Sequence, residues 1–121
     1  MLNCIFVGLG GFIGTVCRYL LGLLPIEMEN GFPIKTLCIN VAGAFVISLI
    51  TALAAKNKSI SPQIILMLKV GICGGFTTFS TFAYESADLL KSGNTLIAFS
   101  YLFGSILLGV LAVFAAQMLV K

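Results

Sequence analysis

The stretch Gly74-Gly75-Phe76-Thr77-Thr78-Phe79-Ser80 lies in the middle of a long apolar run that covers residues 62–90. Adjacent glycines disfavour continuous helix, and the threonines after them are β-branched and carry hydroxyls that bond back to the preceding turn. Non-helical backbone at membrane depth is tolerated only where protein or a water-filled cavity receives its polar groups. The sequence therefore predicts a membrane span with a break at residues 74–79. A simple packing kink is the alternative, and the neighbouring polar and aromatic residues argue against it.

Composition places the rest of the chain in a membrane as well. Of its 121 residues, 60% are hydrophobic and only 9% are charged, and the mean hydropathy is +1.14. A soluble domain carries roughly a quarter charged residues, so this chain could not cover a water-facing surface. Three further apolar runs cover residues 2–24, 33–55 and 94–120, and each is long enough to cross a bilayer. We predict one all-α integral membrane domain, residues 1–121, with four transmembrane helices and a broken third helix.

Basic residues give almost no preferred orientation in the membrane. Four spans place both termini on one side, and the lysines and arginine divide into two sets: Lys56, Lys58, Lys69 and Lys121 on the terminal side, and Arg18, Lys35 and Lys91 on the other. A positive-inside bias is therefore nearly absent, and insertion in both orientations is our hypothesis. The net charge of +3 comes with no dense basic cluster, so nucleic-acid binding is not expected.

The segment after the break contains candidates for an ion path. Broken helices hold ions because freed carbonyls coordinate cations and helix N-termini attract anions. Phe79 and Phe82 are three residues apart and share one helical face, with Ser80 and Thr81 on the same turn. The edge of a phenyl ring is positive, so ring edges can meet a small anion in a dry passage. Apolar filler is the ordinary alternative for two phenylalanines in a membrane helix.

Other spans contribute polar candidates. Asn40 lies inside the second span, where its amide can donate to an anion or join two helices, and Thr36 lies one turn earlier on the same face. In the fourth span, Tyr101 and Ser105 are four residues apart, and Gly109 continues that stripe. The stripe is either a polar track or a close-packing seam. In the first span, Arg18 either reaches the interface or draws anions into a vestibule.

Three motifs together resemble the Fluc/CrcB family of fluoride channels. The stretch Gly10-Gly11-Phe12-Ile13-Gly14-Thr15-Val16-Cys17-Arg18-Tyr19 is similar to that family's opening motif. Thr36-Leu37-Cys38-Ile39-Asn40 looks like its second signature, although Lys35 stands where glycine is common. Gly74-Gly75-Phe76-Thr77-Thr78-Phe79-Ser80-Thr81-Phe82 is similar to its core motif, which is the most specific of the three. The resemblance extends over the whole chain in the same order.

The resemblance implies a passive fluoride exporter of the plasma (inner) membrane that forms an antiparallel, dual-topology homodimer with two pores. It also implies a sodium ion (Na+) at the dimer centre, held by backbone carbonyls of Gly74 and Thr77. The implied site residues are the pore residues Phe79, Phe82, Asn40, Ser80, Thr81, Tyr101, Ser105 and Thr36, and the vestibule residue Arg18. At the far end of the polar track, Gly109 stands where some members of the family carry a hydroxyl.

Three other classes of protein compete with this interpretation. A non-transporting assembly subunit would explain the glycine seams but not the broken third span. A small multidrug-type proton-coupled antiporter would share the length, the four spans and the dual topology. It would need a carboxylate in its first span, and residues 2–24 contain neither Asp nor Glu. An enzyme is the least expected class, because no nucleophile–base pair or metal constellation is visible in the sequence.

Overall fold

A computed structural model describes the whole chain, residues 1–121, and it contains helices only. The elements are α1 (Leu2–Gly22), α2 (Ile34–Lys56), α3 (Pro62–Leu66), the π-helix η1 (Met67–Cys73), α4 (Gly74–Phe76), α5 (Phe79–Lys91) and α6 (Thr95–Val120). Four helical stretches are long and apolar enough to cross a membrane: α1, α2, residues Pro62–Lys91, and α6. The prediction of an all-helical chain with four apolar spans is confirmed.

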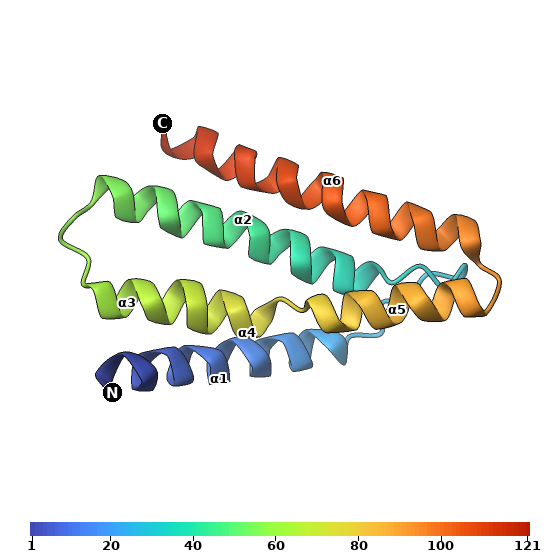
Figure 1. Cartoon of the computed structure of the whole chain (residues 1–121), viewed down its shortest axis with the longest axis horizontal. Coiled ribbons are helices and arrows are strands. Elements are labelled where there is room, and N and C mark those ends of the chain that lie inside the picture. Colours follow the sequence, from blue (N-terminus) through green and yellow to red (C-terminus); the bar gives the residue numbers. More distant parts are fainter.

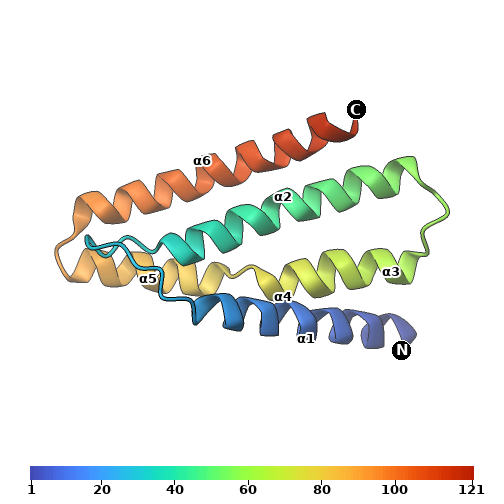
Figure 2. The same ribbon diagram turned by 180° about the vertical axis from the view of Figure 1, so that it is seen from behind.

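The four spans lie side by side with their directions alternating along the chain (Figure 1). α1 and the α3–α5 stretch run one way, and α2 and α6 run the other, so that both termini lie at the same end. Seen from behind, α2 again lies between α6 and the third span, and α1 borders the third span on its outer side (Figure 2). The third span is thus the element that contacts both α1 and α2.

The third span changes conformation at two residues. Thr77 (φ −83°, ψ 159°) and Thr78 (φ −150°, ψ 113°) are extended and separate α4 from α5. Gly74 and Gly75, which the sequence predicts to be non-helical, belong to α4, and Gly74 has helical angles of −63° and −39°. Gly75 has a steric role instead, because a Cβ atom there would lie 2.7 Å from the Gly11 carbonyl oxygen of α1, whereas a Cβ on Gly74 would meet no atom closer than 4.0 Å.

The contact between α1 and the π-helix η1 is close enough to exclude side chains. A Cβ atom on Gly10 would collide with the carbonyl oxygen of Met67, and one on Gly14 would collide with that of Ile72. Small residues at such crossings let two backbones approach, which is how membrane helices gain packing energy without a hydrophobic effect between them. The sequence did not predict the π-helix, which the structure places against α1.

We expect the substitution Gly14→Ala to lower the free energy of unfolding by about 1–3 kcal/mol, because the added methyl group must displace the backbone of η1. Thermal unfolding in detergent measures this loss. Gly8→Ala is the matched control, because nothing lies within 4 Å of a Cβ at that position. Alanine is also the better helix former there, by about 1 kcal/mol at most. Equal melting temperatures for the two variants would contradict the packing assigned to Gly14.

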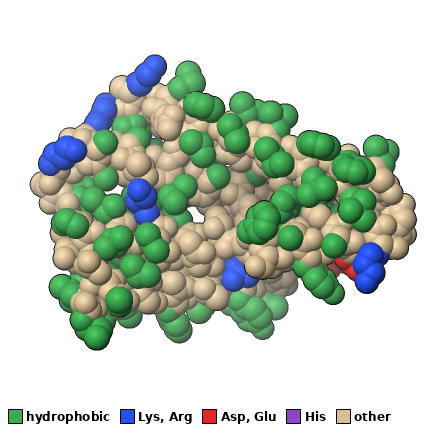
Figure 3. All heavy atoms as spheres, in the orientation of Figure 1, with side chains coloured by type: hydrophobic (Ala, Val, Ile, Leu, Met, Phe, Trp, Pro, Cys, Tyr) green, Lys and Arg blue, Asp and Glu red, His purple; other side chains and the backbone are tan.

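A single copy of the chain leaves most of its apolar surface uncovered. Only 14 residues are buried, and the main core cluster consists of Leu37, Leu89, Ala98 and Tyr101, from α2, α5 and α6. Hydrophobic side chains spread over much of the face seen in Figure 3, with Lys and Arg mostly toward its margins. Such a surface suits a lipid environment.

Candidate functional site

Asn40 of α2 pairs with the extended backbone of the third span. Its Nδ2 donates to the Thr78 carbonyl at 3.1 Å, and the Thr78 backbone N–H donates to its Oδ1 at 2.8 Å. One side-chain amide therefore satisfies both backbone groups of an extended residue, as a neighbouring strand would. The Thr78 hydroxyl in turn accepts from the N–H of Thr81 at 3.1 Å and caps α5. One of the two amide hydrogens of Asn40 is committed to Thr78, and the other has no acceptor in the chain.

The backbone carbonyls in and beside α4 differ in their hydrogen-bond partners. The Cys73 carbonyl accepts from both the N–H and the hydroxyl of Thr77, at 3.0 and 2.9 Å. The Thr77 carbonyl accepts no hydrogen bond, and the Gly74 carbonyl receives none from a side chain or from the two extended residues. A carbonyl at membrane depth must find a partner, so these two oxygens are candidates for cation contact. No cluster of His, Cys, Asp or Glu offers a competing metal site.

Arg18 reaches the same segment from α1. Its Nε–H donates to the Gly75 carbonyl at 3.1 Å, across 57 residues of sequence, and the side chain is half-buried. The sequence left open whether Arg18 extends to the membrane interface or faces a vestibule. In the structure it lines a cavity of about 780 Å³ together with Lys35, Thr36 and Thr81. The side chain thus contacts the third span with one nitrogen and borders a wide cavity.

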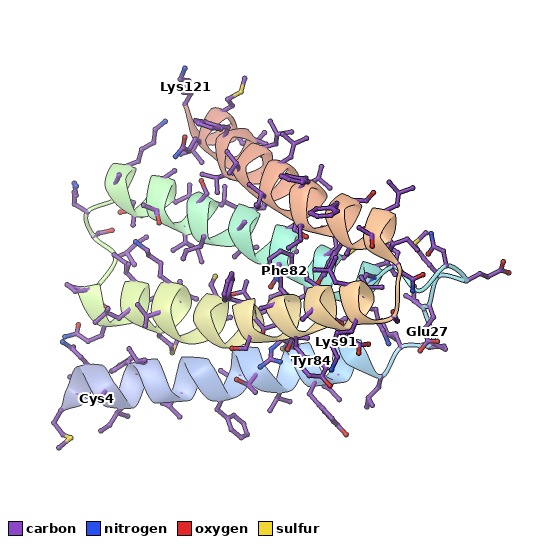
Figure 4. The ribbon with its side chains drawn as sticks, turned by 45° about the vertical axis from the view of Figure 1, so that its right-hand side comes forward. Cys4, Glu27, Phe82, Tyr84, Lys91 and Lys121 are labelled. Atoms are coloured by element: carbon purple, nitrogen blue, oxygen red, sulfur yellow. The ribbon has the colours of Figure 1, made fainter.

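Aromatic rings of α5 and α6 form a short row. The ring centroids of Phe79 and Phe82 are 5.9 Å apart, and the Phe82 ring meets Tyr101 of α6 edge to face at 5.0 Å. Phe82 lies between α5 and the α2–α6 pair, whereas Tyr84 borders the wide cavity (Figure 4). Phe79 is 77% exposed although it is a large apolar side chain beside a helix end. Phe79 therefore remains free to contact a further molecule.

A second cavity, of about 420 Å³, joins most of these groups. Its lining includes Asn40, Gly74, Thr77, Phe79, Phe82 and Ser105. The hydroxyl oxygen of Ser105 is buried and has no hydrogen-bond partner in the chain. The Ser105 hydroxyl and the second N–H of Asn40 therefore have no hydrogen-bond partner in the chain. Both residues line the same cavity as the rings of Phe79 and Phe82.

The remaining predicted site residues are distributed differently. Thr36 and Thr81 line the wide cavity, and Thr78 lines both cavities. Tyr101 is fully buried and lines neither, and Ser80 is exposed and lines neither. The structure therefore joins Asn40, Phe79, Phe82 and Ser105 in one cavity and does not bring Ser80 to it.

Glu85 is one of three charged residues, with Asp88 and Lys69, to which the sequence assigned no role. The hydroxyl of Thr36 donates to one of its carboxylate oxygens at 3.1 Å, and the hydroxyl of Tyr101 donates to the other at 2.9 Å. Glu85 thus joins α2, α5 and α6 through the two hydroxyls that were expected to face the pore. Its position three residues after Phe82, on the same helical face, was the available signal in the sequence.

This chain is similar to known proteins over nearly its whole length. The family model described as "CrcB-like protein, Camphor Resistance (CrcB)" matches residues 5–117. The chain is 41% identical to a "Fluoride-specific ion channel FluC" of Chlorobium phaeobacteroides (strain BS1), over 97% of this chain and 91% of that protein. It is 42% identical to the protein of the same name from Chlorobaculum tepidum, over 100% and 96%. The namesake from Methanopyrus kandleri is 43% identical over 88% and 80%.

The match also favours one of the protein classes that the sequence analysis considered. The proton-coupled antiporter gains no support, because the relatives are named as ion channels and α1 contains no carboxylate. The three motifs that suggested the resemblance lie within the matched residues 5–117. With a family model over almost its full length and relatives above 40% identity, the chain belongs to the CrcB family.

Proposed function

We propose that this protein is a passive, fluoride-selective channel that exports fluoride across the plasma (inner) membrane and relieves fluoride toxicity. The observation that supports this best is the cavity in which Asn40, Phe79, Phe82 and Ser105 meet. Independent support comes from the relatives above 40% identity, which are named as fluoride-specific ion channels.

The anion path follows from what fluoride requires. Fluoride is small and strongly hydrated, so a path must replace its water with donors that do not hold it tightly. The cavity offers donors without net charge: the second N–H of Asn40, the hydroxyl of Ser105, and the ring edges of Phe79 and Phe82, which carry a partial positive charge. Thr36 and Tyr101 act indirectly, because their hydroxyls donate to Glu85 and Tyr101 supports the ring of Phe82. Arg18, Thr81 and Lys35 border the wide cavity, which serves as the vestibule.

The working unit is an antiparallel, dual-topology homodimer. Phe79 is largely exposed and the 420 Å³ cavity that it lines is open, so a second copy supplies the missing wall. A two-fold dimer buries the same patch on both subunits. The near-equal division of basic residues between the two ends fits two opposite orientations.

The interruption at Thr77 and Thr78 holds a sodium ion at the two-fold axis. The Thr77 carbonyl has no donor in the chain, and the Gly74 carbonyl lies one helical turn before it. Neutral carbonyl oxygens suit a weakly held monovalent cation and need no acidic ligand. The carbonyl oxygens of Gly74 and Thr77 would hold the ion, which would supply positive charge between the subunits.

Fluoride efflux from proteoliposomes tests the proposed function. We expect vesicles loaded with fluoride to empty within the recording time when they contain the protein, and vesicles loaded with chloride to retain it. A fluoride electrode and a chloride electrode measure the two rates. A folded, dimeric protein without fluoride flux, or with equal rates for both anions, would overturn the assignment.

Withdrawal of sodium tests the cation. Exchanging sodium for N-methylglucamine during purification should lower the melting temperature of the dimer by about 5–10 °C, because a ligand bound only to the native state stabilises it. Thermal unfolding and size-exclusion chromatography measure the effect, and restoring sodium should reverse it. A dimer with the same melting temperature in both buffers would count against the central ion and leave the fluoride assay unaffected.

A further inference from the structure

We propose that Arg18 is a positioning residue, whose Nε–H holds the interruption of the third span in the shape that receives the cation. This inference rests on the proposed function, and it assigns Arg18 a task other than the supply of vestibule charge. The bond from Arg18 Nε to the Gly75 carbonyl, at 3.1 Å, is the observation that carries it.

The Gly75 carbonyl needs an external donor because of the local backbone. In a continuous helix this oxygen would accept from the N–H of Phe79, four residues later. Thr77 and Thr78 are extended, so the first turn of α5 is separated from the last turn of α4. Arg18 supplies the lost donor from α1, and its bond is charge-assisted, which makes it stronger than a neutral one.

Gly75 lies between the two carbonyls of the cation site. Gly74 precedes it and Thr77 follows two residues later, so the carbonyl that Arg18 holds lies on the short segment of backbone that joins the two oxygens. The opposite side of the segment is already fixed, because Asn40 of α2 holds both backbone groups of Thr78. Arg18 and Asn40 thus brace the segment from two helices, while the Thr77 carbonyl between the two braces is left free.

The covalent structure of arginine allows the bond and the charge to be separated. Glutamine places an amide nitrogen at the same number of bonds from Cα as arginine Nε, and it carries no charge. Lysine keeps the charge but has a methylene group at that atom. Methionine has neither the donor nor the charge there.

The experiment compares Arg18→Gln, Arg18→Lys and Arg18→Met with the unmodified dimer by thermal unfolding over a range of sodium concentrations. We expect Gln to keep the half-saturating sodium concentration within about threefold of the original, and Lys and Met to raise it about tenfold or more. A residue needed only for stability would lower the melting temperature without sodium and leave the half-saturating concentration unchanged. Hydrogen exchange of a peptide covering residues 74–82 should be faster in Lys and Met than in Gln, with or without sodium.

The possible outcomes separate this inference from the proposed function. Weaker sodium binding in Arg18→Gln together with unchanged sodium binding in Arg18→Lys would show that the charge matters, and it would overturn the positioning role. Equal sodium dependence in all four proteins would overturn it as well. An unmodified dimer that does not respond to sodium would overturn the central cation instead. In that case the order of hydrogen-exchange rates decides the role of Arg18 by itself.

Discussion

Asn40→Asp is expected to lower the rate of fluoride efflux at least about 100-fold while the protein remains dimeric. The substitution removes the N–H that donates to the Thr78 carbonyl and places a carboxylate oxygen against that carbonyl. It also puts a negative charge in the cavity shared by Phe79, Phe82 and Ser105. At an effective dielectric constant near 20, a like charge about 4 Å away costs an anion about 4 kcal/mol, which is ample for this loss.

Efflux from proteoliposomes measures the rate, and size-exclusion chromatography checks the dimer. Asn57→Asp is the matched control, because it makes the same chemical change at an exposed site after α2. The Asn57 side chain accepts hydrogen bonds from Ser59 through an oxygen that aspartate retains. We expect the control to keep its efflux rate within about twofold, since an exposed charge is screened by salt. Rates for Asn40→Asp near those of the control would remove Asn40 from the anion path.

Phe82→Ile is expected to lower fluoride efflux by about tenfold or more. The ring of Phe82 contacts Tyr101 edge to face and lies 5.9 Å from Phe79, so its loss takes one wall of the cavity and the support of a second ring. Isoleucine is apolar but has no positive edge to offer an anion. An interaction of about 1.4 kcal/mol in the rate-limiting barrier corresponds to a tenfold change in rate.

The same efflux assay and chromatography apply to this variant. Phe12→Ile on α1 is its control, because Phe12 is 71% exposed and lines neither of the two cavities described above. An efflux rate for Phe82→Ile equal to that of Phe12→Ile would show that the ring is filler, which was the ordinary alternative for this residue.

Local sequence predicted where the spans are, because each needs only about 20 apolar residues and a polar turn to be recognised. It also indicated which segment of the third span is unusual. The predicted break at residues 74–79 includes the two extended residues, Thr77 and Thr78, but it is wider than the observed interruption. Gly74 and Gly75 are helical, and the two threonines after them are extended. Glycine's helix penalty is small beside the packing of α1 against the same face, so tertiary contact decides the outcome.

In the candidate site too, local sequence indicated some features and tertiary contacts decided the others. Residue type indicated that Asn40 and Arg18 need polar partners, since an amide and a guanidinium inside apolar spans must find them. The family resemblance, and not residue type, implied that Asn40, Phe79 and Phe82 share a pore. The partners themselves were not predictable, because they lie 38 and 57 residues away in the chain. The role of Glu85 was missed for this reason, since its hydroxyl donors come from two other helices.

The sequence by itself determined that this protein resides in a membrane, crosses it with four helices, and carries an unusual polar segment in the third. Those properties depend on hydrophobic content and local composition, which can be read without coordinates. Only the tertiary structure decided which carbonyls of that segment are paired and which are free. The Gly75 and Thr78 carbonyls are taken by side chains of α1 and α2, and the Thr77 carbonyl is left without a donor. Hydrogen bonds between distant residues depend on how the helices pack, and that packing is a property of the folded chain.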